Sequence, residues 1–555
     1  MPKVILIFLL IYSLFYSESK AEIPDKIKDI YNGAVMGIVE SEYELGVIYS
    51  KGENINQDES EALKWFKQAA SHGNAKAQNS LGNIYYKGIG VKQNYNESFK
   101  WTQLAAKQGL PDAQYKLGVF FFEGIGVKCN YAKAIEWYIR AANENNIDAQ
   151  NNIGWMYENG KGIKKDFKTA IKWYKLAAEQ GDVVAQTRIG IAYELGQGVK
   201  QDYQKAYKWY KIAADNNNML AQKSLGSLFQ NGLGVNIDNT EAVKWYKLSS
   251  DKGYALAQYQ LGVMYEKGLG VTQNYEEAIR LYRLSSIQGY ALSQSKLGVM
   301  YEMGLGVTQN YEEAMRLYRL AALQNDANAE YNLGLMYEKG VGVPKNYEEA
   351  VKWYKLSGIQ GIEMAQFNLG ALYENGLGVG QNYEEALKWY ELAADKGYQK
   401  AMCNIGVMYQ NGSGVNKNSG KALKWYKLAS EMGNVTAMCN IGTMYQNGDE
   451  IRKDYKEACK WYRRAADLGF AIAQKNLGVM YQNGYGVSLD NSEAYKLYKL
   501  SAIQGNSNAQ CLLGWMYEKG LGIRKNNKNA IIWYGLSANQ GNSIALKNLN
   551  ILYKK

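Results

Sequence analysis

The chain repeats itself with a fixed period of 36 residues. Residues 254–289 and 290–325 are identical at 27 of 36 positions, and a Gly recurs at the same place in fourteen successive units without an insertion or deletion. A constant period of about 20–50 residues indicates a solenoid or a similar array, in which each unit packs only on its neighbours. The 555 residues therefore need no single large core, and function is sought where the copies differ. These reference glycines are Gly46, Gly82, Gly118, Gly154, Gly190, Gly226, Gly262, Gly298, Gly334, Gly370, Gly406, Gly442, Gly478 and Gly514.

The first half of each unit predicts an amphipathic helix. In residues 254–289 the apolar residues Ala257, Leu261 and Tyr265 are four positions apart, so they share one helix face. Gly268 follows as a helix stop, because Gly adopts the left-handed conformation after a helix without strain. A Gly holds this place in all fourteen units.

The second half of each unit predicts another helix. It begins at Asn274, a place that is Asp or Asn in every unit, and these side chains accept hydrogen bonds from the free amides of a first helical turn. It ends at Gly289, a place held by Gly in eleven units. The other three units have Asn, the residue that after Gly best tolerates a left-handed backbone: Asn145, Asn217 and Asn325.

Two recurring features could be mistaken for ligand sites. Most second helices carry a Trp-Tyr pair such as Trp173 and Tyr174, and because the pair recurs along the whole chain we interpret it as core rather than as a cofactor site. The repeated Gly-x-Gly follows a helix and lacks the Lys-Ser/Thr end of a nucleotide loop. We interpret it as a turn.

The N-terminus predicts export. Lys3 precedes an apolar run at 4–16, and Ser19 and Ala21 occupy the small-residue positions of a cleavage site. The run is shorter than the roughly 20 residues that a membrane-spanning helix needs, although an uncleaved anchor is an alternative. Residues 1–21 are thus expected to be a secretory signal peptide. The expected location is secreted or periplasmic in a bacterium, or the endoplasmic-reticulum lumen or extracellular space in a eukaryote.

Histidine and cysteine usage narrows the chemistry. His72 is the single His, so a zinc site with several His ligands is excluded. Cys403 and Cys439 hold the same place in adjacent units, which should lie about 10 Å apart, beyond the roughly 7 Å that a disulfide allows. We therefore expect no bridge between them, and the five cysteines are interpreted as small, half-buried residues.

The repeat pattern, with its A-x-x-x-L-G, Y-x-x-G-x-G-V and W-Y-x-x-A-A segments, resembles the Sel-1-like repeat, a relative of the tetratricopeptide repeat. The resemblance implies an all-α fold, a right-handed α-solenoid superhelix of fourteen helix-turn-helix units. First helices would line the concave face and second helices the convex face. Members usually act as scaffolds or adaptors for other proteins. A cysteine-rich branch with a bridge in each repeat has been linked to β-lactamase activity, but the cysteine pairs are missing here.

The expected domains follow from the repeat boundaries. An N-terminal capping helix is expected at 22–37, the solenoid at 38–541 and a C-terminal capping helix at 542–555. Exposed ends of a solenoid require such caps.

The tetratricopeptide geometry implies that concave residues lie six and three positions before the reference Gly, and one, four and five after it. In the middle units these positions hold apolar residues and a series of glutamates, which we call the Glu series. The predicted partner-binding groove comprises Leu256, Leu292, Tyr259, Tyr331, Phe367, Glu266, Glu302, Glu338 and Glu374. Alternatively, the glutamates are solvated or pair locally with Lys267 and Lys339.

Convex helices carry the positive charge. Lys or Arg holds the slot before Trp in twelve units, as at Lys172, Arg316 and Lys352, and these basic ribs could bind an anionic glycan, nucleic acid or membrane. The preferred function is a protein-binding scaffold for a basic or apolar peptide or protein. A hydrolase like the cysteine-rich branch is a remote alternative. No catalytic residue, metal, cofactor or small-molecule substrate is expected, and neither nucleic acid nor membrane is the preferred partner.

Overall fold

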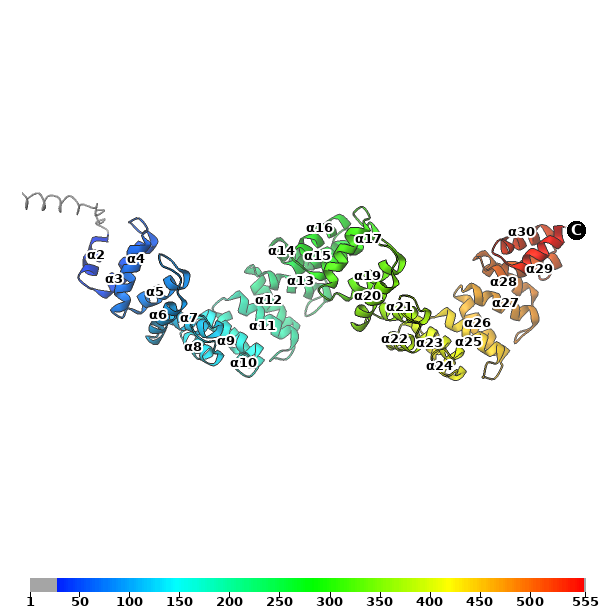
Figure 1. Cartoon of the computed structure of the whole chain (residues 1–555), viewed down its shortest axis with the longest axis horizontal. Coiled ribbons are helices and arrows are strands. Elements are labelled where there is room, and N and C mark those ends of the chain that lie inside the picture. The colour runs from blue at the N-terminus through cyan, green and yellow to red at the C-terminus, as the bar shows by residue number, and fades with distance from the viewer. Residues whose placement is uncertain (1–26, 554–555) are drawn as a thin grey trace, which may run out of the picture. The chain divides into compact units, whose positions relative to one another are not determined.

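The structure, a computed structural model, describes residues 27–553 (Figure 1). This part of the chain holds thirty α-helices and no strand, which confirms the all-α prediction. The predicted signal peptide at 1–21 and residues 22–26 of the predicted cap lie outside the described residues.

Helices follow the repeat. The first helices are α3 (Val39–Lys51), α5 (Ala75–Lys87), α7 (Pro111–Glu123), α9 (Ile147–Asn159), α11 (Val183–Leu195), α13 (Met219–Asn231), α15 (Ala255–Lys267), α17 (Ala291–Met303), α19 (Ala327–Lys339), α21 (Glu363–Asn375), α23 (Gln399–Asn411), α25 (Val435–Asn447), α27 (Ala471–Asn483) and α29 (Ser507–Lys519). The second helices are α4 (Glu59–Ser71), α6 (Tyr95–Lys107), α8 (Tyr131–Asn143), α10 (Phe167–Glu179), α12 (Tyr203–Asp215), α14 (Asn239–Asp251), α16 (Tyr275–Ile287), α18 (Tyr311–Ala322), α20 (Tyr347–Ile359), α22 (Tyr383–Asp395), α24 (Ser419–Glu431), α26 (Tyr455–Asp467), α28 (Asn491–Ile503) and α30 (Asn527–Ala538). A single helix, α2 (Lys28–Val35), precedes the pairs, and α31 (Ser543–Tyr553) follows them.

The chain divides into two compact units, Met1–Ala278 and Ile279–Lys555, with the boundary inside α16. Within each unit successive helices pack against one another, as α7 does on α8 in the first unit and α20 on α21 in the second. Because the loops between them are short, neighbouring helices run antiparallel. Each unit is thus a solenoid in which a helix pair contacts mainly the next pair. The right-handed superhelix stays a prediction.

Helix ends are set by the residues that the sequence places there. Gly268 ends α15 with a φ of 67°, and its amide bonds to the carbonyl of Met264. The side chain of Asn346 opens α20 by accepting a hydrogen bond of 3.1 Å from the amide of Glu349. Asn145, Asn217 and Asn325 have φ values of 61°, 68° and 61°, so the prediction that these Asn residues replace a left-handed Gly is confirmed.

The core of each pair consists of Tyr, Ala and the reference Gly. The Tyr of the second helix is completely buried in eleven of the described pairs. In the pair α19–α20 a Cβ at Gly334 would lie 2.5 Å from Cδ1 of Tyr354. The reference Gly is therefore needed because the two helices approach closely at this point. The Trp-Tyr pair was predicted to be core. The Tyr of the pair is buried, but Trp353 and most other Trp residues are only half-buried, while Trp65 is buried.

Candidate functional site

The predicted groove residues lie on first helices in both compact units. Leu256, Tyr259 and Glu266 are half-buried on α15 in the first unit. The second unit holds exposed Leu292 on α17 and half-buried Tyr331 on α19. The other members, on α17, α19 and α21, are also half-buried: Glu302, Glu338, Phe367 and Glu374.

Tyr331 and Phe367 are in adjacent repeats of the second unit. The Tyr331 ring lies 5.9 Å from the ring of Tyr354, and burial raises the pKa of Tyr331. The Phe367 ring lies 5.6 Å from Tyr390 and 5.2 Å from Tyr398. Phe367 also lines a depression of about 380 Å³ together with residues of α23 and of the segment 433–436. Both rings therefore rest on buried tyrosines while keeping part of their surface exposed.

The Glu series has a structural role that the sequence analysis did not anticipate. In the pair α17–α18 the Tyr318 hydroxyl donates to Glu302 at 2.7 Å, and in α21–α22 the Tyr390 hydroxyl donates to Glu374 at 2.6 Å. Where Gln replaces Glu, the same bond forms, as between Tyr246 and Gln230 at 2.7 Å. The other bonds of this kind join Tyr174 to Glu158, Tyr210 to Glu194, Tyr354 to Glu338, Tyr426 to Gln410, Tyr462 to Gln446, Tyr498 to Gln482 and Tyr534 to Glu518.

These bonds tie the first helix of a pair to the second. They satisfy a hydroxyl that is otherwise surrounded by core atoms, and leaving such a group unpaired costs about 1–3 kcal/mol. Burial and the neighbouring Glu302 raise the pKa of Tyr318, so the phenol stays the donor. The glutamates are therefore structural acceptors as well as candidate binding residues.

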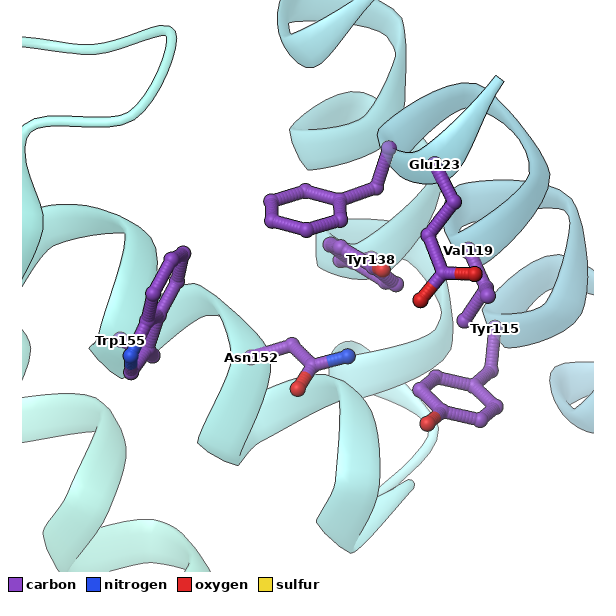
Figure 2. A pocket seen from close by; sticks show the side chains of 7 residues that line it. Tyr115, Val119, Glu123, Tyr138, Asn152 and Trp155 are labelled. Carbon is purple, nitrogen blue, oxygen red and sulfur yellow. The ribbon is translucent and has the colours of Figure 1, made fainter. Parts of the chain in front are cut away.

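A second candidate site, missed by the sequence analysis, lies in the first unit. A pocket of about 380 Å³ opens between α7, α8 and α9, and we call it the α7–α9 pocket. Figure 2 shows Glu123, Val119 and Tyr115 along one side and Trp155 on the other, with Tyr138 and Asn152 between them. Its lining residues are Tyr115, Val119, Phe122, Glu123, Tyr138, Asn152 and Trp155.

The residues of α7 in this pocket occupy the positions that the tetratricopeptide geometry implied for a groove. Tyr115 is three before Gly118, Val119 is one after it, and Phe122 and Glu123 are four and five after it. The sequence feature that could have indicated this pocket is a departure from the repeat pattern. This unit has Phe122 where later units carry Glu or Gln, and Glu123 is the sole acidic residue among the fourteen at its position. The pocket thus lies at these positions of repeats 3 and 4, outside the middle repeats for which the groove was predicted.

The basic ribs are largely neutralised by their own helices. In at least eight second helices of the described residues the Lys or Arg before the Trp slot forms an ion pair with a Glu three residues earlier, for example Lys352 with Glu349 at 2.6 Å and Arg316 with Glu313 at 2.7 Å. The other six are Lys64–Glu61, Lys100–Glu97, Lys244–Glu241, Lys388–Glu385, Lys460–Glu457 and Lys496–Glu493. Exposed pairs of this type add little stability, but they reduce the positive field of each rib.

The remaining chemistry-bearing residues form no further cluster in the described part of the chain. Nδ1 of His72 lies 2.8 Å from Oε2 of buried Glu42. All five cysteines are free thiols. Between residues 27 and 553 no group of three His, Cys, Asp or Glu residues could hold a metal ion. Within the same residues no helix is both long and apolar enough to cross a membrane.

Comparison with known proteins identifies the repeat. A family model described as the Sel1 repeat matches fourteen segments of the chain, each corresponding to one helix pair. No curated protein matches the chain. The matched segments are 39–74, 75–110, 111–146, 147–182, 183–218, 220–254, 255–290, 291–326, 327–362, 363–398, 399–434, 435–470, 471–506 and 507–542.

Two Sel1-type proteins are among the solved structures that resemble the chain. A protective antigen present in uropathogenic Escherichia coli strains, which displays an SLR fold, is 32% identical with a TM-score of 0.61, and the alignment covers 88% of this chain and 93% of that one. A Sel1 repeat protein from Oxalobacter formigenes is 31% identical with a TM-score of 0.45, over 54% of this chain and 88% of that one.

Proposed function

Because the chain belongs to the Sel1 repeat family, whose members generally mediate protein–protein interaction, we propose that it is an exported, non-enzymatic scaffold. It binds a partner protein or peptide on the surface formed by its first helices. Export rests on the N-terminal sequence, which has the pattern of a signal peptide with Ser19 and Ala21 before the cleavage site.

One observation supports binding at the first helices. The core positions of the repeat hold the same few residue types, while the partly exposed positions of the first helices vary, as Tyr331, Phe367 and Lys223 do three before their reference Gly. A scaffold needs a constant interior and a variable surface, because specificity comes from the residues that touch the partner. Partly exposed aromatic side chains are frequent anchors of protein interfaces.

The basic ribs support the alternative function less well. Eight of the basic residues in the described part of the chain are shown paired with a carboxylate on their own helix, and at each of these a polyanion would have to compete with an existing ion pair. A protein that binds phosphates through Lys and Arg releases counterions and loses affinity steeply with salt. Heparin or anionic vesicles that bind tightly at about 150 mM salt would favour the ribs over the first helices.

Removing two aromatic anchors should abolish partner binding. We expect the double variant Tyr331→Ala, Phe367→Ala to lose a partner first identified by crosslinking in the native exported fraction, because most binding energy resides in a few such side chains. The measurement is direct binding of the recombinant partner to the full chain, with circular dichroism as a check on folding. Leu356→Ala with Leu392→Ala is the matched control, since these leucines are 47% and 46% exposed on the second helices of the same repeats. A partner lost only in the control variant would place the site on the other helices.

The charge of the Glu series can be separated from its structural role. Glu302→Gln with Glu338→Gln keeps an acceptor for the Tyr318 and Tyr354 hydroxyls, as Gln230 and Gln410 do in other repeats. If the partner is basic, we expect slower association and a weaker salt dependence at unchanged stability, because steering by charge acts mainly on the association rate. Association kinetics at two salt concentrations measure this, and rates that do not change would show that the carboxylates serve the fold alone.

The export proposal predicts the start of the mature chain. Cleavage after Ala21 should leave Glu22 as the first residue, because small residues at 19 and 21 suit a signal peptidase. Intact mass of the native protein measures this, and an exported chain that still begins at Met1 would contradict the proposed cleavage.

A further inference from the structure

We propose that the α7–α9 pocket binds the side chain of a Lys or Arg residue of the partner protein. This inference rests on the proposed scaffold function and adds the chemistry of one anchor point. All the residues involved lie on three consecutive helices of the first compact unit.

The walls of the pocket are aromatic. The rings of Phe122 and Trp155 lie 5.8 Å apart at an interplanar angle of 75°, and those of Tyr115 and Tyr138 lie 5.9 Å apart at 34°. Ring faces carry negative charge density and attract a cation, and Arg and Lys are the side chains that supply one. The chain already uses this contact elsewhere, for example where the Arg140 guanidinium lies 4.4 Å from the Trp137 ring.

A carboxylate faces the same space. Glu123 lines the pocket from the end of α7, and Figure 2 shows its carboxylate on the same side as Tyr115 and near Tyr138. Burial raises the pKa of both tyrosines, and the charge of Glu123 adds a smaller contribution. No Lys or Arg between residues 27 and 553 forms an ion pair with Glu123. The Glu123 carboxylate would repel an acidic ligand. A purely apolar ligand would displace water from the carboxylate without offering it a hydrogen bond or an opposite charge. A cation with an apolar stem satisfies both the rings and Glu123.

The change from Glu or Gln to Phe122 creates this environment. In later repeats the residue at this position accepts the Tyr hydroxyl, as Glu158 does from Tyr174 at 2.6 Å. The Phe122 side chain has no acceptor atom for this hydroxyl, and its ring forms part of the pocket wall instead. The side-chain amide of Asn152 lies beside the Tyr138 hydroxyl. The hydroxyls and the carboxylate are acceptors that an ammonium or guanidinium group requires.

The location of the α7–α9 pocket favours a side chain of a partner protein over an isolated small molecule as its ligand. The residues of α7 in the pocket hold the same repeat positions as the predicted groove, so the pocket belongs to the type of surface on which a partner chain is proposed to lie. A volume of about 380 Å³ accommodates one long side chain entering from such a chain.

The test uses the full chain labelled with 5-fluorotryptophan, in which Trp155→Phe assigns the Trp155 fluorine resonance. The probes are blocked Ala-Gly peptides with one central Lys, Arg, norleucine or citrulline, and tetramethylammonium chloride. We expect the Lys and Arg peptides to shift the Trp155 resonance saturably, and the norleucine and citrulline peptides to shift it at least about fivefold more weakly. Equal shifts by the neutral peptides would overturn the proposal, as would tetramethylammonium binding without peptide binding, or no shift with any probe.

Two variants test the residues. Glu123→Gln removes the charge, and Phe122→Gln installs the residue that accepts the Tyr hydroxyl in other repeats, so both should fold while weakening Lys and Arg peptide binding about fivefold or more. Glu136→Gln, an exposed change on α8 of the same repeat, is the matched control and should change nothing. If both pocket variants still bind these peptides and still capture the partner as the unaltered chain does, this inference falls while the scaffold function stands. If the unaltered protein captures no partner but still binds Lys peptides in the pocket, the scaffold function would be refuted instead.

Discussion

Replacing Tyr354 with Ala is expected to lower the stability of the ninth and tenth repeats by about 3–5 kcal/mol, because a large buried ring leaves a cavity. Tyr354 is 0% exposed, packs on Gly334, and belongs to a core cluster that also contains Ala365, Leu369 and Leu372 of the next repeat. Its hydroxyl also donates to Glu338. The substitution therefore removes packing within one helix pair and between two pairs.

The loss should stay local. Since repeats in a solenoid contact mainly their neighbours, hydrogen exchange measured by mass spectrometry should show lost protection chiefly at 327–398. Tyr354→Phe is the matched control: it removes only the bond to Glu338 and should cost about 1–2 kcal/mol. An equal loss of protection in all fourteen repeats would show that the chain unfolds as one cooperative body.

The helices could be predicted from the sequence because their ends depend on local chemistry. A Gly after the first helix, an Asx before the second and a constant period fix each boundary within a few residues, as Gly268 and Asn346 show. The partial exposure of the Trp353 side chain could not be predicted from such local sequence signals. Trp and Tyr are adjacent in sequence, and which of them faces the neighbouring helix depends on how the pair packs.

The predicted groove stays a prediction, and the structure adds contacts that the sequence did not indicate. The Glu series was interpreted as surface charge because the hydroxyl that bonds Glu302 comes from Tyr318 on another helix. A constant separation of 16 residues between the two partners was the overlooked signal. The α7–α9 pocket arises where Phe122 breaks that pairing.

Gly334→Ala should destabilise the same repeats by about 1–3 kcal/mol, although Ala normally favours a helix. The added Cβ would lie 2.5 Å from Cδ1 and 2.5 Å from Cε1 of Tyr354, so α19 and α20 would have to separate. Urea denaturation followed by exchange protection at 327–362 measures the effect. Gly535→Ala on α30 is the matched control: no atom lies within 4 Å of its added Cβ, so helix propensity alone should act and stability should rise by about 0.5–1 kcal/mol.

The double variant identifies the close approach as the cause. In a chain that already carries Tyr354→Ala the ring is gone, and Gly334→Ala should cost much less than it does alone, because the atoms it would strike are absent. Two substitutions that act through one contact give a coupling energy of about 0.5–3 kcal/mol, whereas independent ones simply add. Additive losses would mean that Gly334 is required for a reason other than the Tyr354 ring. A clear coupling would explain why the first helix of this pair has Gly where Ala would otherwise make a better helix.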